Sequence, residues 1–438
     1  MTNIRAVTRT TAALIIVAVI VVAGIGLGAY YSSLPSTVPT STSMIMSTSS
    51  TVQATSAVAP INLGVIIPLS GAAGSTGADE KNAYLLAQDT INNGGGIKSL
   101  GGAKVNLIFE DSAGDPATGA NAATKLITQD HVVALIGGYQ SAVTAAVAVV
   151  AERQGIPFLN PDSTDPTLTE HGYMWFFRTT PFDTLFVTQF FQFLNELQTN
   201  YKVSLKNVAI VHENTAFGTS VGQLEENASK VFGYNVVVDI AYSSSKSDVS
   251  SEVLQLVNAK PDVVLMASYT SDSILFVKTF KQYNFAPKVI LGDDAGFVDP
   301  SFPQALGPMA NYMLSREVFS PDLTSIPQIA SVDSAFYKAY NYHLNGNSAR
   351  CYLGVMVMAD VLNRAASLAP NALRSALEAT NLSSSQISMP WQGVKFDAKH
   401  QNILGGGIII QILNGTERTV WPSAFATTRL VFPFPGWT

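Results

Sequence analysis

LIGGYQSAVTAA, residues 135–146, joins a short apolar run to a helical pattern of small residues through two adjacent glycines. Tyr139, Gln140 and Ser141 stand where the helical pattern begins. In α/β proteins, a strand followed by a glycine turn and a hydroxyl at a helix N-terminus presents backbone N–H groups to an anion. The stretch therefore predicts a strand, a turn and a helix, with Ser141 facing a phosphate, a carboxylate or no ligand at all.

Apolar runs and amphipathic helical patterns alternate along the chain from Ile61 onward. Most runs are continuous and suit parallel strands that helices cover on both faces. One open sheet does not comfortably hold this many βα units, and the pattern breaks and restarts near residues 178–181. We therefore expect an α/β fold with two doubly wound lobes. The expected strands are 61–69, 105–111, 131–137, 155–160, 207–213, 234–241, 262–268 and 288–293. The expected helices are 79–92, 117–130, 183–198, 219–232, 249–258, 271–283, 331–344, 349–367 and 371–379. A hairpin is expected over 394–413.

The composition excludes several classes of protein. The 438 residues carry a formal net charge of −6, and Lys and Arg are nowhere clustered, so nucleic acid is not an expected partner. The single cysteine, Cys351, lies in an apolar helical pattern and is expected to be a core thiol, which excludes a disulfide framework and a cysteine-based zinc site. The five histidines show no close ligand spacing, and we expect neither a metal nor a cofactor.

An uncharged apolar run, TAALIIVAVIVVAGIGLGAY at residues 11–30, follows Arg5 and Arg9. The run has the length of a membrane-spanning helix, and basic residues before it stay cytoplasmic under the positive-inside rule. Residues 1–30 are therefore expected to anchor the protein in a membrane, with cleavage after Ala29 as the alternative.

The next segment, residues 31–60, is rich in Ser, Thr and Pro and carries no charge. Such a composition suits an extended linker that holds a domain away from the membrane. Sequons at Asn227, Asn381 and Asn414 fit a location on the cell surface, on the extracellular side of the plasma membrane.

Two motifs suggest enzymatic chemistry. Residues 218–222, GTSVG, match the G-x-S-x-G motif and would make Ser220 a nucleophile, although residues 212–217 separate the match from the apolar run of the preceding strand. Glycines at 71, 74 and 77 precede a helix, and Asp111 ends the second strand, but their spacing is not that of a dinucleotide-binding loop. We expect no catalytic role, and a hydrolase that uses Ser220 remains an alternative.

The candidate site residues lie at the C-terminal ends of the expected strands, where open α/β sheets bind ligands. Hydroxyls and helix amides can hold a carboxylate, an aspartate can hold an ammonium group, and aromatic rings can line an apolar pocket. Together these groups predict a site for an amino-acid zwitterion, although each residue could also serve as a helix cap, a turn or part of the core. The candidates are Ser141, Asp162, Ser163, Thr164, Phe217, Tyr269, Asp293 and Asp294.

An ordered series of motifs resembles the branched-chain amino-acid-binding proteins of ABC importers, which are type I periplasmic binding proteins related to amide and urea receptors. The motifs are PLSGAAGSTG, EDSAGDPATGANAATKLI, LIGGYQS, QGIPFLNPDSTDPTLTEHGYMWFFRTTP, VAIVHENTAFGTS and VWPSAFATTRLVFP. The resemblance covers the chain from Ile61 to its end. It implies two lobes joined by three hinge crossovers, with lobe 1 at 61–180 plus 313–404 and lobe 2 at 181–312 plus 405–438.

The resemblance also implies roles for individual residues. Ser141 and Thr164 match residues that hold the α-carboxylate, Asp294 stands at the place of the acidic residue that meets the α-ammonium, and Tyr269 matches an aromatic residue of the second lobe. Tyr139, Gln140 and Ser163 adjoin these positions and are also candidate ligand-binding residues. An Asp294→Ala variant is therefore expected to lose amino-acid binding and keep its fold.

Three positions depart from the family pattern. Phe217 stands where tyrosine is common, Thr76 where the first loop often has an aromatic residue, and Asp162 where a small residue is usual. Asp162 could add a contact to an ammonium group, bind a basic group or repel the carboxylate of the ligand.

The implied function is capture of an amino acid between the lobes by hinge closure and delivery to an ABC permease in the membrane. A receptor for a short amide, urea or carboxylate, and a ligand-sensing module that signals to a partner protein, are the alternatives. Several contacts from both lobes are required, because micromolar affinity needs about 8 kcal/mol and one charge-assisted hydrogen bond contributes about 1.5–3 kcal/mol.

Overall fold

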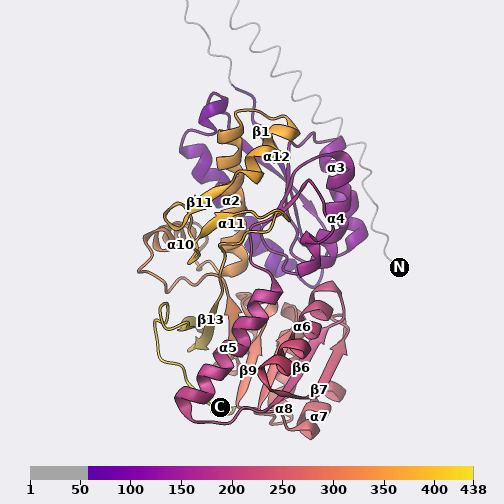
Figure 1. Ribbon diagram of the computed structural model, residues 1–438, viewed down its shortest axis with the longest axis vertical. Helices are drawn as coiled ribbons and strands as arrows, with labels where there is room; N and C mark the ends of the chain where they lie inside the picture. Colours follow the sequence, from indigo (N-terminus) through magenta and orange to yellow (C-terminus); the bar gives the residue numbers. More distant parts are fainter. Residues whose placement is uncertain (1–57, 438) are drawn as a thin grey trace, which may run out of the picture. The chain divides into compact units, whose positions relative to one another are not determined.

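Two β-sheets organise the chain in the computed structural model, which describes residues 58–437 (Figure 1). The first sheet is parallel throughout and has the strand order β2-β1-β3-β4-β5. Its strands are β1 (Ile61–Ile67), β2 (Val105–Asp111), β3 (Leu135–Gly137), β4 (Phe158–Asn160) and β5 (Phe176–Arg178). The expected anchor at residues 1–30, and nearly all of the expected linker at 31–60, lie outside the described residues.

The second sheet has seven strands in the order β14-β13-β10-β9-β8-β6-β7. Five of its strands are parallel, whereas β13 pairs antiparallel with both β10 and β14, so this sheet is mixed. Its strands are β6 (Asn207–Glu213), β7 (Asn235–Tyr242), β8 (Val263–Ala267), β9 (Val289–Gly292), β10 (Leu314–Glu317), β13 (Ile408–Leu413) and β14 (Thr416–Trp421). A separate two-stranded sheet consists of β11 (Asn381–Ser383) and β12 (Gly393–Lys395).

Helices pack against both large sheets, and each sheet with its helices is called a lobe below (Figure 1). Lobe 1, on the first sheet, contains α2 (Gly74–Asn93), α3 (Pro116–Thr128), α4 (Ser141–Gln154), α10 (Pro327–Tyr340), α11 (Gly346–Ala365) and α12 (Pro370–Glu378). Lobe 2, on the second sheet, contains α5 (Asp183–Tyr201), α6 (Ala216–Phe232), α7 (Ser250–Ala259), α8 (Thr270–Gln282) and α9 (Ser301–Leu306). The 3-10 turns are η1 (Lys98–Leu100), η2 (Pro166–Thr169), η3 (Ala295–Phe297), η4 (Gly307–Ala310) and η5 (Ser384–Gln386).

Local sequence signals set the ends of several helices. Asp115 caps α3 by accepting a hydrogen bond from the N–H of Thr118, and Pro116 occupies the first helical position. Helices α4 and α6 end at Gly155 and Gly233, both in the left-handed region that favours glycine. These signals explain why the expected helix boundaries lie within a few residues of the observed ones.

Helix α11 lies at the centre of lobe 1, beside α2 (Figure 1). Cys351, in its first turns, is buried and has no partner cysteine, which confirms the expected core thiol. Within residues 58–437, no single helix is long and apolar enough to cross a membrane. Only α11 and α12 taken together reach that length and apolarity, and they form a pair bent by 112°.

The chain passes between the lobes after β5, after β10 and before β13. Two of these passages lie side by side, because Arg178 and Gln401 form a parallel bridge. The N–H of Arg178 donates to the carbonyl of His400 at 3.0 Å, and the N–H of Asn402 donates to the carbonyl of Arg178 at 2.9 Å. The buried Arg178 guanidinium also donates to the carbonyl of Asp165 at 2.6 Å. The passages are therefore tied to the loop that follows β4.

Two assignments differ from the sequence-based expectation. Strand β10 pairs with β9 in the second sheet, so the passage back to lobe 1 follows Glu317 instead of residue 313. The hairpin expected over 394–413 is wrong, because β12 pairs with β11 whereas β13 pairs with β10 and β14. A short turn closes locally at the Phe396–Asn402 bridge, and three glycines at 405–407 then carry the chain to the other sheet.

The turn from β3 to α4 depends on its two glycines. Gly137 and Gly138 have φ values of 119° and 86°. A Cβ atom on Gly137 would lie 2.4 Å from the carbonyl oxygen of Ile66, and one on Gly138 would lie 2.2 Å from Oγ1 of Thr144. Only glycine fits both the conformation and the available space. The turn places the start of α4 at the C-terminal edge of the first sheet.

We expect the Gly138→Ala variant to lower the free energy of unfolding by about 1–3 kcal/mol, because a side chain is strained at this φ. Chemical denaturation measures the loss. Gly406→Ala is the matched control, since a Cβ at Gly406 meets no atom within 4 Å, and its effect should stay within about 0.5 kcal/mol. Equal losses in both variants would contradict the role given to the turn.

Candidate ligand-binding site

A small cavity lies where loops of the two lobes meet. Its volume is about 10 Å³, the space of a single water molecule. Most of the site residues predicted from the sequence line it: Tyr139, Ser141, Asp162, Ser163, Thr164, Phe217, Tyr269 and Asp294. Ala295 and Arg350 complete the lining. Sequence analysis did not single out either of these two.

Lobe 1 contributes the N-terminus of α4 and the loop after β4. Ser141 is the first residue of α4, and its Oγ accepts from the N–H of Asp165 at 3.4 Å. The hydroxyl of Ser163 instead serves the glycine turn, since it donates to the carbonyl of Gly138 at 2.7 Å. Ser141 and Thr164 are therefore the hydroxyl residues best suited to a ligand. The positive end of the α4 dipole favours an anionic group beside them.

Three aromatic rings form an apolar wall of the cavity. Tyr139, from lobe 1, has its ring centroid 5.7 Å from that of Tyr269, and Phe217 lies 5.6 Å from Tyr269 on the other side. The Oη of Tyr139 is buried and has no hydrogen-bond partner among the described residues. Such orphaned hydroxyls are rare in native interiors, so a polar ligand group is a fitting partner for this one.

Arg350 joins the two lobes across the cavity. Its Nη2 lies 2.7 Å from Oδ1 of Asp162 in lobe 1 and 2.8 Å from Oδ2 of Asp294 in lobe 2. All three side chains are at most 5% exposed. An isolated charge is costly in such an environment, so the two carboxylates and the guanidinium depend on one another.

Asp294 has a second basic partner within lobe 2. Arg316 donates from Nη1 to Oδ2 of Asp294 at 2.6 Å and from Nε to Asp293, while its guanidinium lies 3.6 Å from the ring centroid of Phe186. Asp294 and Ala295 have φ values of 34° and 39°, a strained region for residues with a side chain. Strain of this kind persists where surrounding contacts hold it and is concentrated at functional sites.

The electrostatic environment of the cavity favours protonated carboxyls. Burial raises the pKa of Asp162 to about 6, although the charge of Arg350 opposes the rise. Burial, reinforced by Asp293, also raises the pKa of Asp183 well above its usual range. Burial alone would lower the pKa of Arg350, but Asp162 and Asp294 outweigh it and raise that pKa. The guanidinium therefore stays charged.

Two predicted site residues lie outside the lining. Thr76 donates from Oγ1 to Oδ2 of Asp299 at 2.5 Å and lies 3.3 Å from Oγ1 of Thr270, so it joins lobe 1 to lobe 2 directly. Gln140 precedes α4, and its side chain lies against Gly114, where an added Cβ would meet Nε2 at 2.8 Å. The structure thus places Thr76 at a contact between the lobes and Gln140 beside a loop of lobe 1.

The two enzymatic motifs do not form the arrangements they require. Ser220 lies inside α6 and not on a turn directly after β6, so residues 218–222 form no nucleophile elbow. Asp111 accepts hydrogen bonds from the N–H groups of Leu69, Ser70 and Ala113 and therefore caps the loop before α2.

One cluster in the described part of the chain has the composition of metal ligands. Donor atoms of Glu80, Asp162 and Cys351 lie within 4.8 Å of one another, and all three residues are buried. Three donors fall short of the four used by a structural zinc site, and Arg350 already supplies a cation to Asp162. The cluster is therefore better described as a pair of carboxyls beside a thiol.

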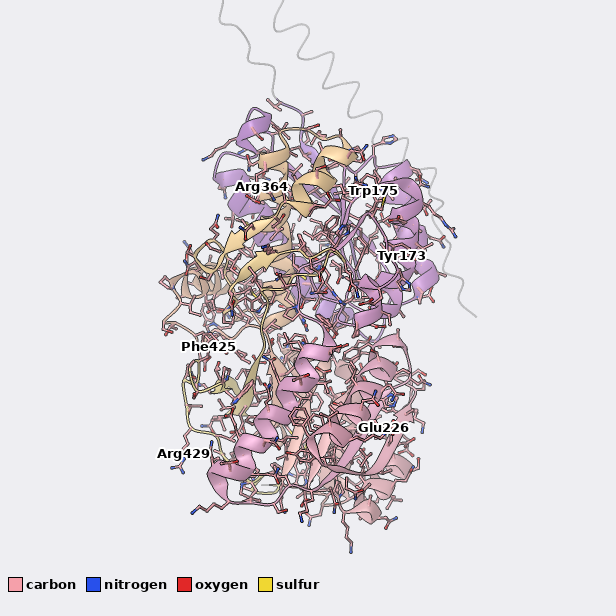
Figure 2. The ribbon with its side chains drawn as sticks, viewed as in Figure 1. Tyr173, Trp175, Glu226, Arg364, Phe425 and Arg429 are labelled. Carbon is pink, nitrogen blue, oxygen red and sulfur yellow. The ribbon has the colours of Figure 1, made fainter. Side chains whose placement is uncertain are left out.

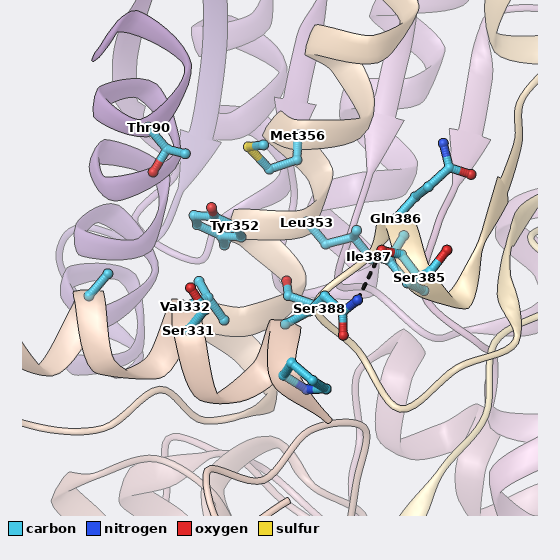
Figure 3. Close-up of a pocket in the computed structure, with 13 residues that line it drawn as sticks. Thr90, Ser331, Val332, Tyr352, Leu353, Met356, Ser385, Gln386, Ile387 and Ser388 are labelled. Carbon is cyan, nitrogen blue, oxygen red and sulfur yellow. Dashed lines mark hydrogen bonds between the residues drawn. The ribbon is translucent and has the colours of Figure 1, made fainter. Parts of the chain in front are cut away.

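A larger groove lies on lobe 1, between α10, α11 and the segment 385–388 (Figure 3). It has a volume of about 470 Å³, and Tyr352, Leu353 and Met356 line it together with the hydroxyls of residues such as Ser331. No carboxylate or basic side chain belongs to its lining. The small cavity, with charged groups converging from both lobes, is therefore the better candidate for a solute site.

Comparison with known proteins identifies the family of the fold. A family model described as periplasmic binding protein matches residues 60–416. Leu/Ile/Val-binding protein homolog 7 of Brucella suis biovar 1 (strain 1330) is 28% identical over 389 residues, covering 86% of this chain and 95% of the relative.

Solved structures show the same fold at low identity. The branched-chain amino acid transporter substrate binding protein LivJ from Streptococcus pneumoniae, in complex with isoleucine, has a TM-score of 0.73 at 20% identity and covers 83% of this chain and 100% of its own. A solute binding protein of an ABC transporter from R. palustris, in complex with benzoate, has a TM-score of 0.73 at 18% identity and covers 86% of this chain and 97% of its own.

The Asp294→Asn variant tests the charge network. The amide keeps an acceptor oxygen but removes the negative charge that pairs with Arg316 and Arg350, so we expect the free energy of unfolding to fall by about 3–5 kcal/mol. The sequence-based expectation for Asp294→Ala, loss of binding with the fold kept, stays a prediction, to which the network adds a loss of stability. Urea denaturation measures the change.

A surface pair supplies the control for Asp294→Asn. Asp360 lies 2.8 Å from Arg364, and both belong to α11; Figure 2 labels Arg364 in lobe 1. Asp360→Asn should cost no more than about 1 kcal/mol. Similar losses in the two variants would argue against a special role for the buried network.

Stability should fall as the pH rises from about 5 to 8. Burial is the largest cause of raised carboxyl pKa values: to about 6 for Asp162 and to about 7 for Asp79, Asp272 and Glu317. A carboxyl with a raised pKa binds its proton more tightly in the folded state, so its stabilisation is lost as the pH rises through the folded value. Each group contributes up to about 1.4 kcal/mol per pH unit. Denaturation across this range should show the decline, and Asp79→Asn should flatten it.

Proposed function

The chain belongs to the periplasmic binding protein family, and we propose that it is the solute receptor of an ABC importer and captures an amino-acid zwitterion between its lobes. The proposal is carried by one observation: hydroxyls at a helix N-terminus, paired carboxylates and an aromatic wall converge on one cavity from both lobes. These three kinds of group match the three parts of an amino acid.

The carboxylate of the ligand belongs at the start of α4. Ser141 and Thr164 line the cavity there, and the first N–H groups of a helix have no partner within it. Charge-assisted hydrogen bonds contribute about 1.5–3 kcal/mol each, and the helix dipole adds about 0.3–1 kcal/mol. Two or three such contacts supply a large part of a micromolar affinity, which corresponds to about 8 kcal/mol.

The ammonium group belongs between Asp162 and Asp294. Nη2 of Arg350 now lies within 2.8 Å of both carboxylates, so the geometry already suits one cation that touches the two lobes at once. Asp293 adds a third carboxyl against the two guanidiniums of Arg316 and Arg350. Three carboxylates against two guanidiniums leave one negative charge, which the ammonium group of the ligand can pair with.

The side chain of the ligand belongs against the aromatic wall of Tyr139, Phe217 and Tyr269. Burying an aliphatic side chain there contributes about 1.5–3 kcal/mol. Phe217 offers no hydroxyl, so this part of the wall favours an apolar group.

Capture requires the lobes to separate and close again. A cavity of about 10 Å³ cannot admit an amino acid, so entry depends on rotation about the three passages between the lobes. A ligand that touches Ser141 in one lobe and Asp294 in the other gains its full binding energy only when the lobes are closed. Closure is then the signal for a permease.

A carboxylate without an ammonium group is the second candidate ligand. Arg350 lines the cavity and can pair with a carboxylate, and the R. palustris relative of this fold is in complex with benzoate. The isoleucine in the LivJ complex favours the zwitterion. Short amides and urea are also within the reach of the hydroxyls and carboxylates.

We also propose a location on the outer face of the membrane, held by residues 1–30 and the linker at 31–60. The sequence of residues 11–30 has the length and apolarity of a spanning helix. Asn227, Asn381 and Asn414, the acceptors of the three sequons, are exposed.

A thermal-shift screen with calorimetry on the hits tests the proposed ligand class. We expect aliphatic L-amino acids to raise the melting temperature, because a ligand that binds only the native state stabilises it. The Ser141→Ala variant should bind the best amino acid about 10- to 150-fold more weakly, the equivalent of one charge-assisted hydrogen bond.

Thr188→Ala is the matched control, since Thr188 is a half-buried hydroxyl residue of α5, outside the cavity, that donates to the carbonyl of Thr184. Its affinity should equal that of the wild type. Stabilisation by aromatic acids and by no amino acid would replace the zwitterion with the carboxylate candidate.

A further inference from the structure

A buried carboxyl group lies behind the cavity wall. Glu80, on α2, is 0% exposed, and neither of its carboxyl oxygens has a hydrogen-bond donor among residues 58–437. Asp162 is in a related situation, since Oδ1 pairs with Arg350 while Oδ2 is buried without a donor. Glu80 belongs to neither the cavity lining nor the core of apolar side chains, so its charge state needs a physical account.

The two carboxyls face each other. Their oxygens, with the thiol of Cys351, lie within 4.8 Å of one another. Two carboxylate anions at this separation in a buried site would repel each other, and each would keep an unsatisfied oxygen. A single proton on Glu80 removes one charge and turns an acceptor into a donor aimed at Asp162. One proton therefore removes the repulsion, gives Oδ2 of Asp162 a donor and leaves only the carbonyl oxygen of Glu80 without one.

We propose that Glu80 is a positioning residue for solute capture: its protonated carboxyl donates a hydrogen bond to Oδ2 of Asp162 and so holds the Asp162 carboxylate toward Arg350 and the cavity. The proposal rests on the proposed function, because its importance to the protein lies in what Asp162 does for a solute. Glu80 itself does not touch the solute.

The groups around the pair support this arrangement. Burial raises the pKa of Glu80 well above its usual range, the charges of Asp162 and Asp79 raise it further, and Arg350 opposes them. The pKa of Asp162 rises only to about 6. Near neutral pH the pair thus holds one proton, and it resides on Glu80. The titratable and charged groups facing the pair are Asp79 and Tyr84 of α2, Arg350 and Cys351 of α11, Asp294 after β9 and Arg316 of β10.

Solute affinity should then have a maximum in pH. Below the pKa of Asp162, at about 6, Asp162 becomes neutral and loses its attraction for an ammonium group. Above the pKa of Glu80, a second negative charge appears behind Asp162, releases its Oδ2 and repels the carboxylate of the solute. Capture is strongest while exactly one of the two carboxyls is ionised.

Calorimetry on the full chain, with L-leucine and benzoate as probes, tests this from pH 6 to pH 9. We expect the wild-type affinity for the bound probe to fall about tenfold for each pH unit above the pKa of Glu80. Glu80→Gln should remove this fall, because an amide still donates to Asp162 and cannot ionise. Glu80→Leu should bind weakly at every pH, because it offers no donor.

Glu225 provides a matched control in lobe 2. It is also 0% exposed, and neither of its oxygens has a donor in the described part of the chain, but it does not line the cavity. Glu225→Gln should keep the wild-type pH profile of affinity. The same profile in wild type and Glu80→Gln would overturn the proposal.

Infrared spectroscopy gives a second readout that needs no solute. Burial raises the pKa values of several other carboxyls, Glu225 among them, so the readout is a difference between spectra at neutral pH. Glu80→Gln should lose one carbonyl-stretch component of the protonated acids, Asp162→Asn should shift that same component, and Glu225→Gln should keep it while losing a different one. A Glu80→Gln spectrum without any lost component would overturn the shared proton even if a probe binds. If neither probe binds, the proposed ligand class fails, and the infrared band alone decides the role of Glu80.

Discussion

The contact of Arg350 with carboxylates from both lobes is the constraint on which the site depends. A guanidinium that is almost completely buried needs acceptors close by, and here Asp162 and Asp294 supply them from opposite sides of the cavity. Their positions in turn depend on the start of α11, on the loop after β4 and on the strained residues after β9. Arg316 repeats the principle within lobe 2 by pairing with Asp293 and Asp294. The lobes therefore meet through charges that neither lobe can satisfy fully by itself.

Buried carboxyl groups outnumber buried basic groups in this interior, and protonation of some carboxyls reduces the resulting negative charge. Burial raises the pKa values of Asp79, Glu80, Asp183 and Glu317 above their usual ranges. A buried carboxylic acid donates one hydrogen bond and carries no charge, so it costs less than a buried anion. The protein thus places acids behind the site without surrounding the solute with uncompensated negative charge.

Much of the architecture follows from the sequence, because continuous apolar runs between helical patterns predict parallel strands directly. Strands β2 and β6 have the expected bounds. The expected hairpin over 394–413 failed because a pattern of apolar residues predicts strands and does not specify their partners. Strands β5 and β10 are three and four residues long, too short for a periodic pattern.

The site was predicted where its residues follow strands and was missed where they lie on helices. Asp162, Tyr269 and Asp294 were found because strand ends meet at one edge of a sheet. Arg350 lies in the second turn of α11, just before a long apolar stretch of that helix, and only a charge beside a buried pattern signals it. Glu80 carried a similar signal, since it shares the core-facing side of α2 with Tyr84, Ala87 and Ile91. Thr76 was expected at the ligand because it stands at a ligand-contacting position of the family pattern. A pattern does not specify what the side chain contacts, and here Thr76 donates to Asp299.

The direct bonds between the lobes have a consequence for the fidelity of transport. Thr76 with Asp299, and Arg350 with Asp294, join the lobes through side chains of the protein alone. Every such bond lowers the free energy of the closed form whether or not cargo is present, so it raises apparent affinity by making the competent form more populated. Because these bonds also stabilise the closed form without solute, more of the unliganded receptor is closed. A permease that recognises the closed form would then also bind receptors that carry no solute. Stronger bonds between the lobes would raise the affinity for a dilute solute and would also raise the fraction of transport cycles that start without one.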